Sequence, residues 1–311
     1  MSKIGFVGLG AMGSQLAGRF LAGGHQVYGT NRTAAKAAPL IGRGLAWCET
    51  PREVARSAEV IFSMVTDDAA LASIASGRDG ILAALTPDKV WVDMSTVSPD
   101  AARALAGRVA GMGAALLNAP VSGSVPSAEQ GTLEIMVGGD PRVFARVEPL
   151  LRLLGDRVSR VGRNDQALLL KLAINLSLAE QMLAFSEGVL LAERGGLDRK
   201  LAMEVILGSA IGSPMLKARA PLLLHLPPDA WFTLRLVQKD LRLAFEAAST
   251  LRVPRPGAAV ADEIVTVARR MGYGDRDLAA LFEVLTKIGT NETKESSPVS
   301  RGPSAGASHE P

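Results

Sequence analysis

Short apolar segments alternate with amphipathic segments over the first half of the chain. Ala-rich stretches such as 51–58 and 98–112 separate the apolar runs, which cover residues 3–7, 26–30, 59–64, 89–93, 114–118, 133–137 and 158–161. Continuous apolar strands that alternate with crossover helices are typical of a parallel sheet covered on both faces. Residues 1–163 are therefore predicted to form a Rossmann-type, doubly wound α/β domain.

The pattern changes in the second half, where apolar residues recur at helical spacing. The clearest helical segments are 181–197, 201–210, 237–251 and 259–273. Residues 164–290 are therefore predicted to form an all-helical domain. The segment 291–311 is dominated by Ser, Pro, Gly and charged residues, and it is predicted to be a disordered tail because it has little apolar surface to bury.

Composition and charge exclude several classes of protein. The charges of the 34 basic and 31 acidic residues nearly cancel. The chain has no Lys/Arg run of patch length, and only 4% of its residues are aromatic and able to stack on bases, so a nucleic-acid binder is not predicted. The most apolar stretch is interrupted by Lys171 and Asn175, so no membrane span is predicted. One cysteine, Cys48, and three scattered histidines predict neither a disulfide nor a metal site, and a cytoplasmic protein is expected.

The first chemical motif is a glycine-rich turn after the first predicted strand. Its residues are Gly8, Leu9, Gly10, Ala11, Met12 and Gly13, and a helical segment follows. Glycines at this spacing allow a tight turn and let a pyrophosphate approach backbone N–H groups at a helix N-terminus. A dinucleotide-binding site is predicted, and a purely structural glycine turn is the alternative.

The end of the second predicted strand favours NADPH, with NADH possible. Where NAD-binding domains usually carry an acid, this chain has Asn31, Arg32 and Thr33. A guanidinium can pair with a 2′-phosphate, which an acid would repel. The alternative is that Arg32 is a solvated loop residue that stacks on the adenine of either cofactor.

Four further motifs, together with the glycine turn, resemble the β-hydroxyacid dehydrogenase family. They are DMSTVSP (93–99), NAPVSGSVPSAEQGTLEIMVGG (118–139), KLAIN (171–175) and KDLRLA (239–244), in the family's order and spacing over residues 3–287. Within the family the chain looks most like the glyoxylate and succinic semialdehyde reductases, with the 3-hydroxyisobutyrate dehydrogenases second, on the basis of Ser124, AFSEG (184–188), SPM (213–215) and the spacing of Phe232 from Asp240. The resemblance implies an NADPH-dependent reductase of a small carboxylate-bearing aldehyde.

Lys171 and Asn175 are the candidate catalytic residues. They are four residues apart and so share one face of a helix. A lysine among apolar neighbours has a lowered pKa, which suits a proton donor working near neutral pH. The resemblance implies that Lys171 is the general acid of reduction and the base of oxidation, oriented by Asn175. The alternative is a lysine whose stem lies along the surface and whose ammonium stays in water.

The resemblance also implies roles for three loops. Ser122 and Gly123 would hold the substrate carboxylate, and Thr96 would lie beside nicotinamide and substrate. Val65 and Thr66 would cover the adenosine side of the cofactor. For the 122–123 and 65–66 segments the alternative is an ordinary loop.

Lys239, Asp240 and Phe232 are candidates from a later helical region. The resemblance places Lys239 and Asp240 at the domain junction, near nicotinamide and substrate, and puts Phe232 in the substrate pocket. Adjacent helical residues do not face the same way, so one of the charged pair is expected to point elsewhere. A surface charge pair, and core packing for Phe232, are the alternatives.

Three positions depart from the family pattern. Asn118 stands where Asp is frequent, which removes a charge and affects how the loop is braced. Ser124 stands where many 3-hydroxyisobutyrate dehydrogenases have Gly, and its extra hydroxyl would either crowd a branched substrate or bind a polar one. The stretch before Lys171 keeps only Gly162, which predicts a stiff link between the domains.

Two other functions and one assembly are also considered. Relatives of this fold reduce imines, but they generally lack the family lysine, so Lys171 argues against that activity. A non-catalytic NADP-binding scaffold would be expected to have lost the lysine. The apolar content of the second half predicts association through the C-terminal helices, as a homodimer or homotetramer.

Overall fold

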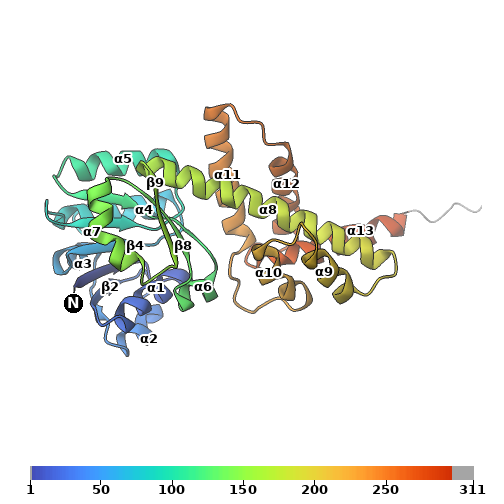
Figure 1. The fold of residues 1–311 in the computed structure, drawn as a ribbon, viewed down its shortest axis with the longest axis horizontal. Coiled ribbons are helices and arrows are strands. Elements are labelled where there is room, and N and C mark those ends of the chain that lie inside the picture. The colour runs from blue at the N-terminus through green and yellow to red at the C-terminus, as the bar shows by residue number, and fades with distance from the viewer. Residues whose placement is uncertain (1, 296–311) are drawn as a thin grey trace, which may run out of the picture.

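The chain folds into a sheet domain followed by a helical domain, in a computed structural model that describes residues 2–295 and the side chains through residue 290. In Figure 1 the sheet domain lies on one side and the helical domain on the other, and one long helix, α8 (Asn164–Arg194), runs between them. This confirms the predicted class, an α/β region followed by an all-helical region.

The strands and helices of the sheet domain alternate as predicted. Its strands are β1 (Lys3–Val7), β2 (Gln26–Thr30), β3 (Ala46–Trp47), β4 (Val60–Ser63), β5 (Val90–Asp93), β6 (Ala115–Asn118), β7 (Val121–Ser122), β8 (Glu134–Gly138) and β9 (Arg157–Gly162). Its helices are α1 (Ala11–Ala22), α2 (Ala38–Ile41), α3 (Pro51–Ser57), α4 (Asp68–Ala75), α5 (Pro99–Ala110), α6 (Val125–Gln130) and α7 (Pro141–Leu151), with short 3-10 turns at Ala34–Ala37 and Ile81–Ala84.

The sheet is mixed rather than wholly parallel. Its order is β3-β2-β1-β4-β5-β6-β8-β7, with β9 beside β8. The strands from β3 to β6 are parallel, but β8 runs antiparallel to both β6 and β7. The predicted doubly wound sheet is thus parallel from β3 to β6 and becomes mixed at the β8 edge, where the chain returns through the short β7 and α6 instead of a full crossover helix.

The second half is helical throughout its described part. Its helices are α8, α9 (Arg199–Gly208), α10 (Pro214–Leu224), α11 (Leu234–Leu251), α12 (Pro256–Arg270) and α13 (Leu281–Glu295), with a 3-10 turn at Leu278–Ala280. Helix α13 continues through residue 295 and so includes 291–295, the first residues of the segment predicted as a tail. Glu and Lys are good helix formers and extend a helix that packing has already nucleated. The rest of the predicted tail, 296–311, lies outside the described residues.

Helix α8 belongs to both cores. Ala167 and Leu168, in its first turns, are buried with the sheet-domain residues, whereas Met182 and Val189 are buried in the helical domain. The backbone N–H of Arg163 donates to Gln166 Oε1 at 2.8 Å, so α8 starts directly after β9. By length and composition α8 could cross a membrane, yet it packs along its length against α5, α9, α11, α12 and α13.

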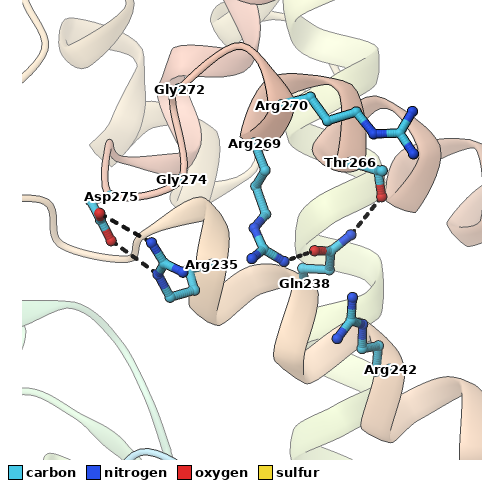
Figure 2. Close-up of a pocket in the computed structure, with 9 residues that line it drawn as sticks. All are labelled: Arg235, Gln238, Arg242, Thr266, Arg269, Arg270, Gly272, Gly274 and Asp275. Atoms are coloured by element: carbon cyan, nitrogen blue, oxygen red, sulfur yellow. Dashed lines mark hydrogen bonds and ion pairs between the residues drawn. The ribbon is translucent and has the colours of Figure 1, made fainter.

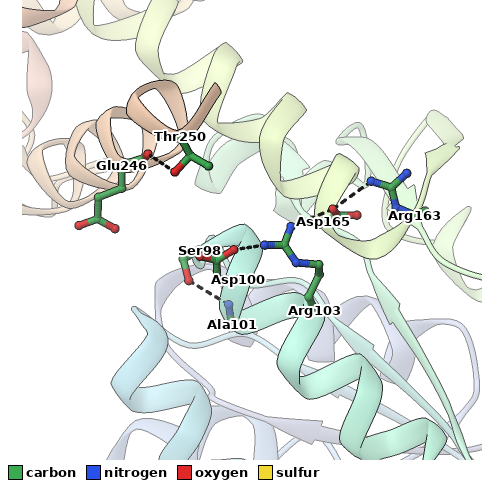
Figure 3. A network of polar contacts seen from close by, with 8 residues as sticks. All are labelled: Ser98, Asp100, Ala101, Arg103, Arg163, Asp165, Glu246 and Thr250. Atoms are coloured by element: carbon green, nitrogen blue, oxygen red, sulfur yellow. Dashed lines mark hydrogen bonds and ion pairs between the residues drawn. The ribbon is translucent and has the colours of Figure 1, made fainter. Parts of the chain in front are cut away.

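An ion-pair cluster fixes the first turn of α8 against α5. Figure 3 shows Asp165 between Arg103, from α5, and Arg163. Burial alone would raise the pKa of the Asp165 carboxyl, but hydrogen bonds from the two guanidinium groups hold that pKa below its usual value. The Ser98 hydroxyl caps α5 by accepting from the Ala101 N–H at 3.0 Å. The two domains are thus joined by a charged contact as well as by α8.

Candidate active site

The glycine turn has the geometry that a dinucleotide needs. Gly8 has φ of +99°, and a side chain there would collide with the carbonyl oxygen of Met64. A side chain at Gly13 would collide with the carbonyl oxygen of Gly8, so α1 packs close to β1. At Gly10, the N-cap of α1, a Cβ would meet nothing within 4 Å and no side chain caps the helix. The N-terminus of α1 is therefore open to an anion.

Of the three residues after β2, Asn31 holds the glycine turn in place and Arg32 is an exposed cation. Asn31 Oδ1 accepts the backbone N–H of Leu9 at 3.0 Å, and Asn31 Nδ2 donates to the Thr33 carbonyl. Asn31 thus holds the glycine turn against the end of β2. Arg32 is exposed, and no residue of the described chain forms a hydrogen bond or ion pair with its guanidinium. Arg32 is the group free to receive a phosphate.

A buried carboxylate, Asp93, organises the carboxyl ends of three strands. Asp93 is 0% exposed, and its Oδ1 accepts hydrogen bonds from the hydroxyls of Ser63 and Ser95, both at 2.7 Å. Burial raises its pKa above the usual value, and these hydrogen bonds oppose that shift. Ser95 Oγ in turn accepts the backbone N–H of Val65 at 2.9 Å. The network therefore fixes the Val65–Thr66 loop beside the glycine turn.

Asn118 connects this network to the helical domain. Its amide Nδ2 donates to Asp93 Oδ2 at 3.3 Å, and its Oδ1 accepts from Asn164 Nδ2 at 3.0 Å. Asn164 is the first residue of α8. An aspartate at 118 would bring a second carboxylate against Asp93, so the amide found in this chain serves as a neutral bridge between β5, β6 and α8.

Lys171 lies at the start of a chain of polar groups that crosses from α8 to α11. Its Nζ donates to Asn175 Oδ1 at 2.8 Å, and Asn175 Nδ2 donates to Asp240 Oδ2. Asp240 Oδ1 accepts no hydrogen bond from the described residues but lies 2.7 Å from Lys239 Nζ. Lys171 is 9% exposed and Asp240 is 3% exposed. The sequence-predicted pair Lys171 and Asn175 therefore shares a face and a hydrogen bond.

Burial perturbs the Lys171 amine strongly. Its pKa lies at about 8, because burial disfavours the charged form. The carboxylate of Asp240 favours the charged form and opposes this shift, whereas the nearby Lys239 adds to it. An amine with this pKa exchanges protons readily near neutral pH, which suits a general acid or base.

Lys239 connects these polar groups to the sheet domain. Its Nζ donates to the carbonyl oxygen of Thr96, in the loop after β5. Lys239 and Asp240 thus both take part in the same cluster, although adjacent helical residues face different ways. Long side chains can curve around a helix and meet even when their Cα–Cβ bonds diverge. Thr96, Lys239, Asp240, Asn175 and Lys171 are brought together.

The other predicted substrate residues lie in separate contacts. Ser122 ends β7, and Gly123, at φ of +133°, could not carry a side chain without striking Leu133. Phe232 packs against the core of the helical domain, and its backbone N–H donates to Asp277 Oδ2 at 3.0 Å. No hydrogen bond or ion pair within the described residues joins Ser122, Gly123 or Phe232 to Lys171, so their roles remain predictions.

Sequence reasoning gave no role to Asp93, Ser63, Ser95 or Asn164. For Ser63 and Asp93, which end β4 and β5, the available signal was their position, since polar residues that end buried strands of a parallel sheet meet at one edge. Asn164 begins α8, so this signal does not apply to it. Among residues 2–295 no group of three or more His, Cys, Asp or Glu side chains is arranged to hold a metal.

Comparison with known proteins identifies both halves of the chain. Residues 3–162 match the model of the NAD-binding domain of 6-phosphogluconate dehydrogenase. Residues 166–285 match the model described as NAD-binding of NADP-dependent 3-hydroxyisobutyrate dehydrogenase.

Individual relatives cover almost the whole chain. Glyoxylate/succinic semialdehyde reductase 2 of Arabidopsis thaliana is 33% identical over 93% of this chain and 81% of its own length. The 2-hydroxy-3-oxopropionate reductase of Escherichia coli is 34% identical over 91% of this chain and 97% of its own length. The solved structure of Psf3 in complex with NADP+ and 2-OPP matches with a TM-score of 0.84 and 28% identity, over 91% of this chain and 99% of Psf3. The protein therefore belongs to the 3-hydroxyisobutyrate dehydrogenase-like β-hydroxyacid dehydrogenase family of NAD(P)-dependent oxidoreductases.

Proposed function

We propose that the protein is an NADPH-dependent reductase of a small carboxylate-bearing aldehyde, with Lys171 as the proton donor. The observation that carries the proposal is the buried Lys171 amine, whose pKa of about 8 and hydrogen bond to Asn175 suit proton transfer near neutral pH. The first relatives, reductases of glyoxylate, succinic semialdehyde and 2-hydroxy-3-oxopropionate, support an aldehyde that carries a carboxylate.

The residues around the glycine turn fit NADPH. The open N-terminus of α1 at Gly10 would hold the pyrophosphate, and the unpaired guanidinium of Arg32 would hold the 2′-phosphate. The bound cofactor supplies the hydride. Asn31 would contribute by keeping the turn in shape, since its side chain is already engaged with Leu9 and Thr33. NADH, which lacks the 2′-phosphate, would use the same turn without the contact to Arg32.

The hydrogen-bonded side chains Lys171, Asn175 and Asp240, which extend from α8 to α11, would deliver the proton. As the carbonyl oxygen gains negative charge, the Lys171 ammonium gives it a proton and becomes a neutral amine. Asn175 Oδ1 would orient the Lys171 amine toward the substrate oxygen. Asp240 accepts from the Asn175 amide and so holds Oδ1 toward Lys171. The substrate carboxylate would lie at the Ser122 hydroxyl and the Gly123 backbone N–H, at the end of β7. In the oxidation direction the neutral amine accepts the proton.

A second candidate is a 3-hydroxyisobutyrate dehydrogenase. The match of residues 166–285 to the NADP-dependent 3-hydroxyisobutyrate dehydrogenase model favours it. The same amine would then act as the base on the hydroxyl group. The two candidates differ in substrate and in preferred direction rather than in machinery.

Initial rates test the proposal directly. Glyoxylate, succinic semialdehyde, tartronate semialdehyde and methylmalonate semialdehyde are each assayed with NADPH and with NADH, and 3-hydroxyisobutyrate is assayed with NADP+. We expect one carboxylate-bearing aldehyde to turn over, faster with NADPH. Lys171→Ala should lower kcat by about 10²- to 10⁴-fold, the usual contribution of a positioned acid, while the Kd for NADPH stays within about threefold of wild type.

Lys217→Ala, which removes an exposed lysine of α10, is the matched control and should keep the wild-type rate. A Lys171→Ala rate above a tenth of wild type would rule out the proton-donor role. Turnover of a cyclic imine, but of none of the aldehydes, would favour an imine reductase. NADPH binding without turnover of any of these substrates would favour the scaffold.

We also propose that the helical domain associates with a second copy. Large apolar side chains are exposed on the C-terminal part of α8, on α9 and after them, including Leu191, Leu197, Leu201, Val205 and Ile211. Burying such a face would stabilise a dimer or tetramer. Light scattering after size-exclusion chromatography gives the mass, and a monomer at micromolar concentration would contradict this proposal.

A further inference from the structure

A pocket lies on the helical domain, between α11, α12 and the turn that follows α12. Its volume is about 420 Å³, within the range of roughly 300–1,000 Å³ typical of small-molecule sites. Figure 2 shows the side chains that line it: Arg235, Gln238, Arg242, Thr266, Arg269, Arg270 and Asp275, with Gly272 and Gly274 at the turn. None of these residues belongs to the series of polar contacts formed by Lys171, Asn175, Asp240 and Lys239.

The lining carries a large excess of positive charge. It contains four arginines and one acid, Asp275. Arg235 pairs with that acid through two contacts of 3.1 and 3.2 Å. A second acid, Asp262, also contacts the lining, because its Oδ1 accepts from Gln238 Nε2 at 3.2 Å. Two of the arginines, Arg242 of α11 and Arg270 of α12, are exposed. Neither forms an ion pair or a hydrogen bond with any residue in the described part of the chain.

The pocket is also rigidly built. Gln238 is 3% exposed, and its amide is fully engaged: Nε2 donates to Thr266 Oγ1 at 2.6 Å, and Oε1 accepts from Arg269. This contact fixes the Arg269 guanidinium. The turn is held to α11 as well, because the Arg235 backbone N–H donates to the Gly274 carbonyl at 2.9 Å. Side chains held before a ligand arrives lose little entropy on binding.

We propose that this arginine pocket binds a small multivalent oxyanion, with phosphoryl or carboxylate groups, at a site separate from the Lys171 chain. Guanidinium groups match both kinds of group by paired N–H donors. A concave wall that carries one sign of charge also concentrates the field on a bound ion. Arg242 and Arg270 have no ion-pair partner in the described chain, and Arg269 is bonded only to the neutral amide of Gln238. A ligand with more than one negative charge would therefore balance the charge of the pocket better than a monovalent ion.

The test is calorimetric titration of the NADP+-saturated protein with pyrophosphate and, separately, with citrate, at ionic strength held constant with chloride. Saturation with NADP+ blocks the glycine turn, one of the two other anion sites proposed above. The carboxylate site at Ser122 and Gly123 is the second, and it is unchanged in the variants below. We expect one ion per chain, and the double variant Arg242→Gln/Arg270→Gln should raise Kd at least tenfold. Its substitutions remove two exposed side chains that form no hydrogen bond or ion pair with the described residues, so folding is spared.

The control variant Arg78→Gln/Arg142→Gln removes the same charge from exposed arginines of the sheet domain and should bind as wild type. Preference for pyrophosphate or for citrate distinguishes phosphoryl from carboxylate ligands. Equal weakening in both double variants would overturn the proposal, because only net charge would then matter. Binding of neither anion would overturn it too and would direct attention to an acidic segment of another chain.

Discussion

Asp93 in the sheet domain and Lys171 in the helical domain are both buried ionisable groups, yet their surroundings differ in kind. Burial pushes each toward its neutral form, raising the pKa of Asp93 and lowering that of Lys171 to about 8. Asp93 is surrounded by neutral donors from the ends of neighbouring strands, whereas Lys171 faces a carboxylate and a second ammonium from another helix.

The difference explains why one group suits a structural role and the other suits catalysis. The hydrogen bonds to Asp93 come from a rigid sheet edge and fix the Val65 loop, Asn118 and the start of α8. The charges around Lys171 lie at the junction of two helices, where a carboxylate and an ammonium act on its pKa in opposite directions. The fixed hydrogen bonds to Asp93 thus stabilise the fold, whereas the opposed charges of Asp240 and Lys239 adjust the pKa of Lys171.

The largest expected effect on stability comes from Asp93→Ala. The hydroxyls of Ser63 and Ser95 and the amide of Asn118 would lose their common acceptor while remaining buried. We expect the free energy of unfolding to fall by about 3 kcal/mol, since each orphaned buried donor costs roughly 1–3 kcal/mol. Urea denaturation followed by circular dichroism measures this change.

Lys171→Met is the contrasting variant for the same measurement. It removes a buried ammonium and keeps an apolar stem of similar length, so the free energy of unfolding should stay equal or rise, although turnover is lost. If Lys171→Met destabilised the protein as much as Asp93→Ala, the separation between a structural and a catalytic buried charge would fail.

A smaller effect is expected from Asn118→Asp, which brings a second carboxyl group to Asp93. Two buried acids this close favour a protonated form, so their pKa is raised in the folded state. A raised folded pKa means that stability is present at low pH and is lost as pH rises past about 4, the value in the unfolded chain. We expect a destabilisation of about 1–3 kcal/mol at pH 8 and a smaller one at pH 5, measured by urea denaturation at both values. Asn118→Ser, without the acid, should show no such pH dependence.

The smallest effect concerns the pH profile of Asp240→Asn. Reduction requires protonated Lys171, so kcat should fall as pH rises through about 8 in wild type. The Asp240 carboxylate favours the ammonium form, and its removal also leaves the positive charge of Lys239 uncompensated. The falling limb should therefore move to lower pH by about one unit. Asp275→Asn, which removes an exposed acid, should leave the limb in place, and a shift to higher pH in Asp240→Asn would contradict the assignment of the limb to Lys171.

Local features of the sequence were enough to predict the alternating half, the helical half and the glycine turn. These depend on the period of apolar residues and on backbone freedom at Gly8, which are properties of neighbouring positions. The pairing of Lys171 with Asn175 was also predictable, because a spacing of four residues on a helix is a local geometry. The direction of β8 was not, since an apolar run reads the same in either direction.

What the sequence alone determined, then, is which segments are strands, which are helices, and which local motifs stand at their ends. Only the tertiary structure decided which of those ends meet. It brought Asp240 to Asn175, Lys239 to Thr96 and Asn118 to Asp93, and it gathered the arginines of α11 and α12 around one pocket. The physical reason is that such contacts join residues far apart in sequence, and their distances are set by how whole elements pack rather than by any repeating pattern along the chain.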